Sequence, residues 1–424
     1  MRFVADLHIH SHYSRATSPR MNIVSLDRWA RVKGIKVMGT GDFTHPAWFG
    51  ELKEKLDPAE PGLFALKNSK SGSRFLLTAE ISCIYSKGDR VRKVHIVIFA
   101  PSFEAAGTIN SRLGKIGNLA ADGRPILGLD AQELAKMVLD ASPGCMVVPA
   151  HAMTPWFGVF GSKSGFDSLE ECFGDHAKYI YAIETGLSAD PAMLWRIPDG
   201  RNVCLLSNSD AHSPEKIGRE VNIFDIKPDY FEMMKAIKEK DPKKFLYTIE
   251  FFPEEGKYHL DGHRNCGVSL MPQESIKTNG LCPKCNRPLT IGVLNRIQEL
   301  ATEPEGYKPD GAIPYKSLVP LQEIISDVLG VMVANQSVKS EYAKLVKAFG
   351  SEFSVLLGPG LSELEVVTSA EIAQGIVNAR EGKVELIAGY DGVFGRVKVA
   401  KNKNGSVFSG TGEKNKFIPQ QGLF

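Results

Sequence analysis

The sequence predicts an α/β protein whose N-terminal part, residues 1–255, is a barrel of strands and helices. In this part short β-rich runs alternate with amphipathic stretches, a pattern typical of βα units. Eight side chains of metal-binding type fall at the downstream ends of its apolar runs, and that end of the strands carries the chemistry in α/β barrels. At 424 residues the chain exceeds one typical core, so further domains are expected after the barrel.

The helical spacing of apolar residues predicts helices over 25–33, 131–139 and 230–240 within this barrel. The alternation of strands and helices stops between Phe251 and Gly256. An insert with three cysteines then covers about 257–290, and a helix is expected over 291–301.

The C-terminal part opens with a linker rich in turn residues, 304–311. Apolar residues at helical spacing predict a helix over 321–329 that stops at Gly330. A capping box from Thr368 to Glu371 predicts a helix that ends by Gly382, and a closing hairpin follows, with strands over 384–388 and 396–401 around the turn 389–395. We therefore predict a barrel (1–255), a zinc-binding module (256–300), a mixed α/β domain (301–400) and a basic, glycine-rich tail (401–424).

Composition describes an ordinary globular chain, with 43% hydrophobic and 24% charged residues and a net charge of +2. No apolar run is long enough for a membrane span, and the first strand begins without a signal peptide. Four of the seven cysteines lie in apolar surroundings, as buried thiols do in a reducing compartment; they are Cys83, Cys145, Cys172 and Cys204. We expect a monomer in the cytoplasm, with no membrane partner.

The eight side chains at the strand ends predict one metal centre with more than one ion. They are His8, His10, Asp42, Glu80, His95, His151, Asp210 and His212. His8 and His10 alternate along one strand, so both imidazoles are expected on one face. Carboxylates can bridge two ions, and Glu80 and Asp210 are the best candidates for shared, catalytic ligands. Such sites hold ions about 3.5–4 Å apart for phosphoryl transfer. We expect two to three divalent ions, Zn²⁺, Mn²⁺ or Mg²⁺.

The insert carries a second, separate metal signature. His263 and Cys266 form one pair with two residues between them, and Cys282 and Cys285 form another. Paired spacings of this kind hold one structural Zn²⁺. His259 is an alternative fourth ligand. The module either joins the domains or helps to hold the substrate.

The ligand pattern resembles the polymerase-and-histidinol-phosphatase (PHP) phosphoesterases, in which His-x-His opens the pattern and Asp-x-His closes it. The resemblance implies a distorted seven-stranded βα barrel with a trinuclear centre on the eight residues above. Two departures concern the third ion. Arg15 stands where the family often has Asp, and Phe43 stands where it favours His, although His45 is close enough to compensate.

A fuller match covers essentially the whole chain and is similar to endonuclease Q. It is carried by the segments 39–46, 157–166, 184–191 and 389–395 together with the cysteine insert. The resemblance implies a DNA repair endonuclease that cuts on the 5′ side of deaminated bases. Some relatives are called helicases, but this chain has no Gly-x-x-x-x-Gly-Lys-Ser/Thr phosphate loop.

Two Trp-Phe-Gly segments follow candidate ligands, at 48–50 and 156–158. Aromatic side chains on glycine-rich loops suit stacking on an unpaired base, and their alternative role is to pack the loops onto the barrel. At the C-terminus, Gln421-Gly422-Leu423-Phe424 is similar to a shortened sliding-clamp-binding peptide on a basic tether.

We therefore predict a metal-dependent endonuclease acting 5′ to hypoxanthine, uracil, xanthine or abasic sites, leaving a 3′-hydroxyl and a 5′-phosphate. DNA with damaged bases and a sliding clamp are its expected partners. The alternatives are a PHP-type phosphatase acting on a small phosphomonoester, and a non-catalytic repair adaptor on a degenerate barrel.

Overall fold

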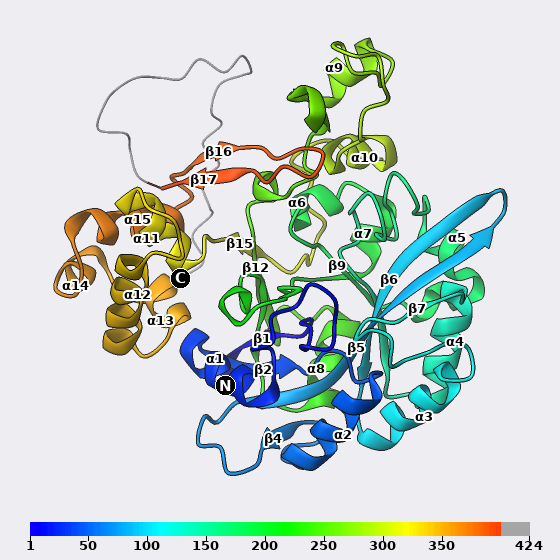
Figure 1. The fold of residues 1–424 in the computed structure, drawn as a ribbon, viewed down its shortest axis with the longest axis horizontal. Coiled ribbons are helices and arrows are strands. Elements are labelled where there is room, and N and C mark those ends of the chain that lie inside the picture. The colour runs from blue at the N-terminus through cyan, green and yellow to red at the C-terminus, as the bar shows by residue number, and fades with distance from the viewer. Residues whose placement is uncertain (400–424) are drawn as a thin grey trace.

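The computed structural model describes residues 1–399 and has the mixed α/β fold that the sequence predicts (Figure 1). The predicted tail, residues 401–424 with its clamp-like peptide, lies outside the described residues. In Figure 1 the helices α2, α3, α4 and α5 line the outer side of the strands, while helices α11 to α15 gather at the opposite side.

Twelve strands belong to residues 1–255. They are β1 (Arg2–Asp6), β2 (Ile35–Gly39), β3 (Leu56–Pro58), β4 (Phe64–Leu66), β5 (Arg74–Lys87), β6 (Arg90–Ala100), β7 (Ile126–Leu127), β8 (Met146–Pro149), β9 (Ala182–Glu184), β10 (Cys204–Leu206), β11 (Val221–Asp225) and β12 (Phe245–Glu250).

The helices of this part include all three that the sequence predicts, and each boundary lies within two residues of the expected one. The α-helices are α1 (Ile23–Lys33), α2 (Pro46–Lys55), α3 (Phe103–Leu113), α4 (Ala131–Ala141), α5 (Leu169–Phe173), α6 (Pro191–Leu194), α7 (Pro198–Asn202) and α8 (Tyr230–Glu239). The 3₁₀ helices are η1 (Gly174–Tyr179), η2 (Pro214–Lys216) and η3 (Pro253–Glu255).

The main sheet runs in the order β15-β12-β11-β1-β2-β5-β4-β3, where β15 is Tyr315–Ser317 of the C-terminal region, and β6 joins β5 to β8. Strands β1, β2 and β5 are parallel, as βα units require. Strands β5 and β6, however, form a long antiparallel hairpin, and β11 is antiparallel to β1. The regular alternation expected from the sequence is therefore only partly realised. Strands β9 and β10 pair with each other, and a bridge between Ile9 and Ala211 connects the segment after β10 to the segment after β1.

Alternate residues of the strands face two different parts of the core. In β1, Phe3 and Ala5 belong to a smaller cluster that also contains residues of α8, whereas Val4 packs against the larger cluster. Strand β8 is buried at every position, as a strand covered on both faces must be. This packing fixes the register of the strands, because a shift by one residue would exchange the two faces.

The remainder of the described chain contains a small module and a C-terminal region. The module has β13 (Asp261–His263), η4 (Arg264–Cys266), β14 (Val268–Leu270), α9 (Pro272–Lys277) and α10 (Val293–Leu300). The C-terminal region has β15 (Tyr315–Ser317), α11 (Leu321–Leu329), α12 (Gln336–Phe349), α13 (Glu352–Leu357), α14 (Leu361–Glu365), α15 (Ala370–Arg380), β16 (Glu385–Ile387) and β17 (Arg396–Lys398).

The predictions for helix α11 and for the closing hairpin are confirmed. Gly330 ends α11 in the left-handed conformation, and β16 pairs with β17 in antiparallel fashion. The cap of α15 differs from the prediction. Ser369 caps the helix by accepting a hydrogen bond from the Ile372 amide, because the Thr368 hydroxyl donates to Glu341 at 2.9 Å instead.

The C-terminal region shares its core with the barrel. One hydrophobic cluster extends from barrel residues such as Ile9 to Ile376 of α15 and includes Val293 and Ile297 of α10, whereas the part of the module around Val268 has a small separate cluster. A buried ion pair also crosses this boundary, because Lys33 Nζ of α1 lies 2.7 Å from Glu352 of α13. The barrel and the C-terminal region are therefore held together by burial of both apolar and charged groups.

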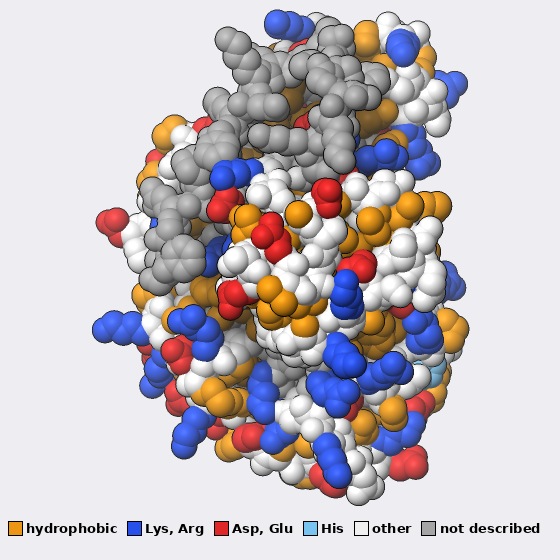
Figure 2. Space-filling view, turned by 90° about the vertical axis from the view of Figure 1, so that its left-hand side faces the viewer, with side chains coloured by type: hydrophobic (Ala, Val, Ile, Leu, Met, Phe, Trp, Pro, Cys, Tyr) orange, Lys and Arg blue, Asp and Glu red, His pale blue; other side chains and the backbone are white. Residues whose placement is uncertain are grey.

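None of the helices within residues 1–399 has the length and apolar character needed to span a bilayer. On the face shown in Figure 2, Lys and Arg side chains are numerous in the lower half, with Asp and Glu between them. This mixture agrees with the net charge of +2.

Candidate metal centre

Six of the eight predicted ligands follow the ends of strands. His8 and His10 come shortly after β1, and the strand expected to include them ends at Asp6. Their positions are fixed by main-chain hydrogen bonds to the neighbouring loop, since the Asp210 amide donates to the His8 carbonyl at 2.9 Å and the His10 amide donates to the Ala211 carbonyl at 3.0 Å. The first and last parts of the predicted pattern therefore lie side by side.

Glu80 and His95 differ from the expected placement at strand ends. Both lie inside the antiparallel hairpin of β5 and β6, where Glu80 faces Val97 and Ser82 faces His95 across the strands. The two side chains are two register positions apart on adjacent strands, so they share one face of the hairpin. The hairpin thus presents both groups to the same side of the centre.

Three of the predicted residues have positive φ angles, which non-glycine residues adopt rarely. The angles are +52° at Asp42, +32° at His151 and +46° at Asp210. Such conformations each cost on the order of 1–3 kcal/mol and concentrate at functional sites. Here they direct side chains from the ends of three strands toward one point.

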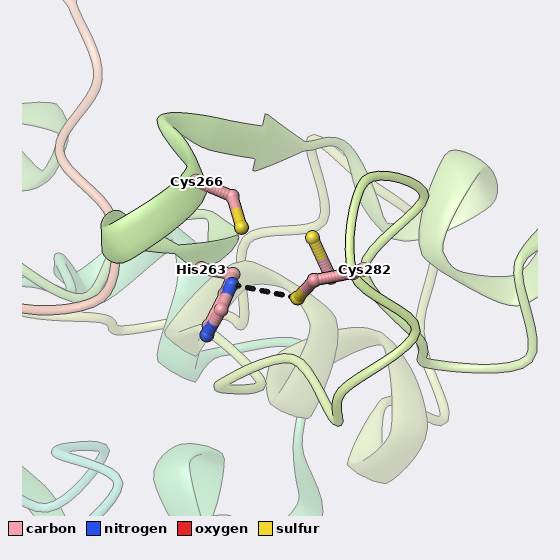
Figure 3. A group of neighbouring side chains, drawn as sticks. His263, Cys266 and Cys282 are labelled. Atoms are coloured by element: carbon pink, nitrogen blue, oxygen red, sulfur yellow. Dashed lines mark hydrogen bonds between the residues drawn. The ribbon is translucent and has the colours of Figure 1, made fainter.

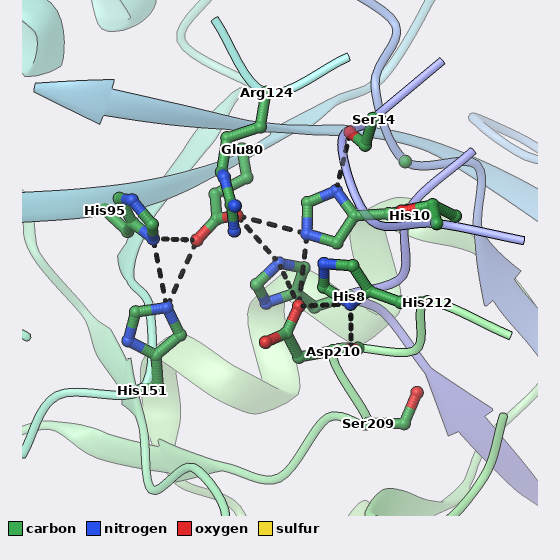
Figure 4. A network of polar contacts seen from close by, with 12 residues as sticks. His8, His10, Ser14, Glu80, His95, Arg124, His151, Ser209, Asp210 and His212 are labelled. Atoms are coloured by element: carbon green, nitrogen blue, oxygen red, sulfur yellow. Dashed lines mark hydrogen bonds and ion pairs between the residues drawn. The ribbon is translucent and has the colours of Figure 1, made fainter. Parts of the chain in front are cut away.

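The side chains meet in two adjoining groups of possible ligands (Figure 4). The first consists of His8, His10, Glu80 and Asp210, and the second of Glu80, His95 and His151. In the first, His10 Nε2 lies 3.1 Å from both Glu80 Oε2 and Asp210 Oδ1. In the second, Glu80 Oε1 lies 2.8 Å from His95 Nδ1 and 3.3 Å from His151 Nε2. Glu80 belongs to both groups and uses a different oxygen in each.

The ligand atoms of the two groups have the features of a cation site. Four of their buried atoms make ion-pair contacts within the centre but no hydrogen bond to any described residue: His8 Nε2, His10 Nε2, Glu80 Oε1 and Asp210 Oδ1. Buried polar atoms without a partner are rare in native proteins. Imidazole nitrogens and carboxylate oxygens suit transition-metal ions and Mg²⁺, so a divalent ion fits these residues.

The pKa shifts of Glu80 and His8 also indicate a cation site. Burial favours the neutral form of each group, but the interactions of Glu80 with its neighbours, chiefly His95 and Arg124, outweigh burial and hold the pKa of Glu80 well below its usual range. Burial likewise opposes charge on His8, yet Glu184 and Glu80 hold its pKa well above the usual range. The centre therefore favours positive charge, which a metal ion supplies.

Two histidines of the first group are each oriented by a carboxylate behind the ring. Glu184 lies 3.0 Å from His8 Nδ1, and Asp42 lies 2.9 Å from His10 Nδ1. Metal-bound histidines commonly bond a carboxylate through their other ring nitrogen. Asp42, predicted as a ligand, thus lies outside both groups, and its second oxygen accepts hydrogen bonds from the amide and the hydroxyl of Ser11.

His212 also lies outside the two groups. Its ring is 4.5 Å from the ring of His10, and its Nδ1 is 2.9 Å from the Asp210 carbonyl. His45, which was to compensate at the third ion, stacks on Tyr13 with a centroid distance of 4.2 Å. Arg15 has an 83% exposed side chain 3.5 Å from Asp122.

Two residues of the centre, Glu184 and Arg124, were not predicted from the sequence. Glu184 ends strand β9 after Ala182 and Ile183, so it follows the rule used for the other candidates and was recognisable by it. Arg124, whose Nη1 donates to Glu80 at 3.1 Å, lies in a loop without any strand signal. Only the fold brings it to the centre.

The cysteine insert forms a third group of possible ligands, His263, Cys266, Cys282 and Cys285 (Figure 3). Cys285 Sγ lies 3.4 Å from His263 Nδ1. The alternative ligand His259 lies outside this group, and its buried ring faces the backbone of Ser188 and Pro253. Within the described chain, the part of the module around these ligands has a separate core of three buried residues, while α10 packs into the main core, so a metal cross-link would stabilise this small part. A tetrahedral zinc ion fits the four ligands.

The chain is similar to several known proteins over part or nearly all of its length. The model of the MJ0043 C-terminal domain family matches residues 320–383. The protein MJ0043 of Methanocaldococcus jannaschii is 33% identical over 60% of the chain, although this chain covers only 32% of the length of that relative. The protein YqxK of Bacillus subtilis is 30% identical over 94% of the chain and 99% of its own length.

Two solved structures are similar over nearly the whole chain. The lesion-specific endonuclease PfuEndoQ of Pyrococcus furiosus is 34% identical, with a TM-score of 0.83 over 94% of this chain and 95% of its own. An endonuclease Q bound to a 27-mer duplex with an abasic lesion at its active site is 33% identical, with a TM-score of 0.84 over 96% and 99%. At these identities and coverages, the chain belongs to the endonuclease Q family.

Proposed function

We propose that this protein is a metal-dependent, lesion-specific DNA endonuclease. The observation that carries the proposal is the pair of adjoining ligand groups that share Glu80, within a chain of the endonuclease Q family. Two neighbouring cation sites suit the hydrolysis of a phosphodiester, in which both the attacking and the leaving oxygen need stabilisation.

Under this proposal His8, His10, Glu80 and Asp210 hold one divalent ion, and Glu80, His95 and His151 hold another. Zn²⁺, Mn²⁺ or Mg²⁺ would activate water at neutral pH and neutralise charge on the phosphate. Asp42 and Glu184 hold the histidine rings in place, and His212 stands beside the first site as a candidate ligand for a third ion. Arg124 adds a permanent positive charge at the edge of the centre.

The expected cut lies 5′ to a deaminated base (hypoxanthine, uracil or xanthine) or to an abasic site. The products are a 3′-hydroxyl and a 5′-phosphate. The complex of the related endonuclease Q with an abasic duplex supports this substrate class. Damaged bases pair weakly, so turning the nucleotide out of the duplex costs less than for a normal base.

The proposal also covers the barrel, the cysteine insert and the partners of the protein. We propose that β1, β2, β5, β6, β8, β9 and β10 form a distorted seven-stranded PHP-type barrel, and the Ile9–Ala211 bridge between the segments after β1 and β10 supports this arrangement. His263, Cys266, Cys282 and Cys285 hold one structural Zn²⁺. A monomer that contacts a sliding clamp through residues 421–424 remains our expectation.

The test uses end-labelled duplexes with purified protein and Mn²⁺ or Mg²⁺. One duplex carries a single hypoxanthine, one a uracil, one an abasic site and one no lesion. We expect cutting immediately 5′ of each lesion and none in the control duplex. Glu80→Gln and Asp210→Asn should abolish cutting, whereas Glu220→Gln, a change at a buried carboxyl outside the centre, should retain it.

Failure to cut any DNA, together with release of phosphate from small monoesters, would favour the phosphatase. Binding of lesion DNA without any hydrolysis under all metal conditions would favour the adaptor.

A further inference from the structure

Three aromatic side chains and one lysine form a continuous surface beside the metal centre. We call Trp156, Lys257, Tyr258 and Phe394 the aromatic strip. The Trp156 and Tyr258 rings meet edge to face at a centroid distance of 5.6 Å. Lys257 Nζ lies 5.6 Å from the ring of Tyr258 and 5.6 Å from the ring of Phe394. These residues come from three segments that are far apart in the sequence.

One end of the strip is fixed to the metal centre. Trp156 precedes Phe157, whose ring lies 4.2 Å from the ring of His95 and whose carbonyl accepts a hydrogen bond from the His95 amide at 2.8 Å. Phe157 has a φ of +68°, so its backbone is held in a conformation that a flexible loop would not maintain. The position of Trp156 is thus set by the wall of the centre.

The other end is fixed to the module and the closing hairpin. The Gly392 amide donates to the Lys257 carbonyl at 2.8 Å, and the Leu260 amide donates to the Gly389 carbonyl at 3.0 Å. Asp391 accepts hydrogen bonds from the Thr290 hydroxyl and from the amide of Arg264, both at 2.7 Å. The hairpin turn is therefore bound to the strand that leads into the zinc ligands, and Phe394 is held in place at the surface.

The exposure of these rings is greater than packing requires. Phe394 is 65% exposed and Trp156 is 38% exposed, although the backbone on either side of both is well fixed. The strip therefore combines two exposed rings, one half-buried ring packed on the core and a lysine, and such a surface suits stacking with bases and contact with a phosphate backbone. Nucleic acid bases stack on such rings in proteins that bind single strands.

We propose that the aromatic strip is the stacking platform for unpaired bases next to the lesion in the DNA strand that is cut. This inference rests on the proposed function. Trp156 would contact the base nearest the centre, and Phe394 with Lys257 would hold bases and backbone farther along the strand. The zinc module, on this view, sets the position of the strip because Lys257 and Tyr258 lead directly into it.

The experiment measures single-turnover cutting of a hypoxanthine duplex at increasing enzyme concentration for Trp156→Ala, Phe394→Ala and Lys257→Gln. Phe231→Ala is the matched control, because Phe231 is 50% exposed on α8 beside Gly144. Removing one stacked ring should raise the half-saturating enzyme concentration about tenfold. Lys257→Gln should also reduce the slope of log affinity against log salt by about 0.7, the value for one phosphate of a single strand.

The fluorescence of 2-aminopurine provides a second, direct measurement of base stacking. With 2-aminopurine beside the lesion, wild-type enzyme should change the fluorescence of the probe, and Phe394→Ala and Trp156→Ala should reduce that change. Strip variants that cut, bind and respond like Phe231→Ala would overturn the inference while leaving the endonuclease intact. A wild-type enzyme that cuts no lesion duplex would instead refute the proposed function.

Discussion

Substitution of Glu184 by Gln tests whether the carboxylate behind His8 supports the metal centre. Glu184 is 2% exposed, and both of its oxygens have partners. Its Oε1 lies 3.1 Å from His8 Nδ1 and accepts from the Asn208 amide group at 2.8 Å. Its Oε2 lies 3.0 Å from the same nitrogen and accepts from the His151 main-chain amide at 3.1 Å. The residue thus connects ligands from both groups.

The size of the effect follows from these contacts. In either orientation, the NH₂ group of the glutamine introduced at this position would face a donor, either Asn208 Nδ2 or the His151 amide, so one hydrogen bond is lost. Such a loss in a buried site costs about 1–3 kcal/mol. Removal of the carboxylate behind a metal-bound histidine lowers metal affinity or activity roughly 10- to 100-fold, which corresponds to about 1.4–2.7 kcal/mol.

The assay is a titration of metal-depleted enzyme with Mn²⁺, followed by cutting of a hypoxanthine duplex. Glu184→Gln should require roughly 10- to 100-fold more metal for half-maximal cutting. Glu220→Gln is the control, because burial and the neighbour Glu250 raise the pKa of Glu220 well above its usual range, so the acid is already neutral. Equal metal requirements for Glu184→Gln and wild type, with both proteins folded, would refute this reasoning.

Three further predictions concern stability. If the proposed zinc is bound, Cys282→Ser should remove it, as measured by elemental analysis, and should lower the melting temperature of the module, because the core around the ligands is small. Retention of a full equivalent of zinc by the variant would contradict the assignment. Lys33→Met should reduce the free energy of unfolding by about 3–5 kcal/mol in urea titrations, because it leaves Glu352 buried without its cation; a loss below about 1 kcal/mol would mean that water or another group replaces Lys33. Burial raises the pKa of Glu250 to about 8, so the folded protein holds this proton more tightly than the unfolded chain and loses stability as pH rises from about 4.5 to 8. Glu250→Gln should remove this loss, so the free energy of unfolding of the variant should rise relative to that of the wild type as pH increases from about 4.5 to 8. A difference in free energy that stays constant with pH would show that Glu250 is ionised in the folded protein.

Much of the fold was predictable because local signals and tertiary structure agree. The helix ending at Gly330 and the hairpin around residues 389–395 depend on capping and turn chemistry within a few residues. His151 and Asp210 were recognisable as candidates because they follow short apolar runs. The rule placed them correctly after the ends of β8 and β10.

The other features of the fold and of the site could not be predicted, because they depend on contacts between segments that are far apart in the sequence. The antiparallel hairpin that places Glu80 beside His95 cannot be recognised from alternation alone, since parallel and antiparallel strands have similar sequences. A carboxylate that binds a metal and one that orients a metal-binding histidine differ only in direction, so the sequence could not separate Asp42 from Asp210. Arg124 gave no signal because its loop is positioned by contacts with the barrel.

The hydrophobic core extends without a break from the barrel to Ile376, so the barrel and the C-terminal helices depend on each other for stability. A gene that lost the segment for α11 to α15 would encode a barrel with an exposed apolar surface and with Lys33 facing the site of the lost Glu352. To stay soluble and folded, such a shortened chain would also need polar residues in place of the newly exposed apolar residues of α1. A deletion of α11 to α15 alone does not provide these substitutions. The module also joins this core through Val293 and Ile297 of α10, and only its small cluster around Val268 is separate, so loss of its cysteines would affect mainly the part around the four ligands.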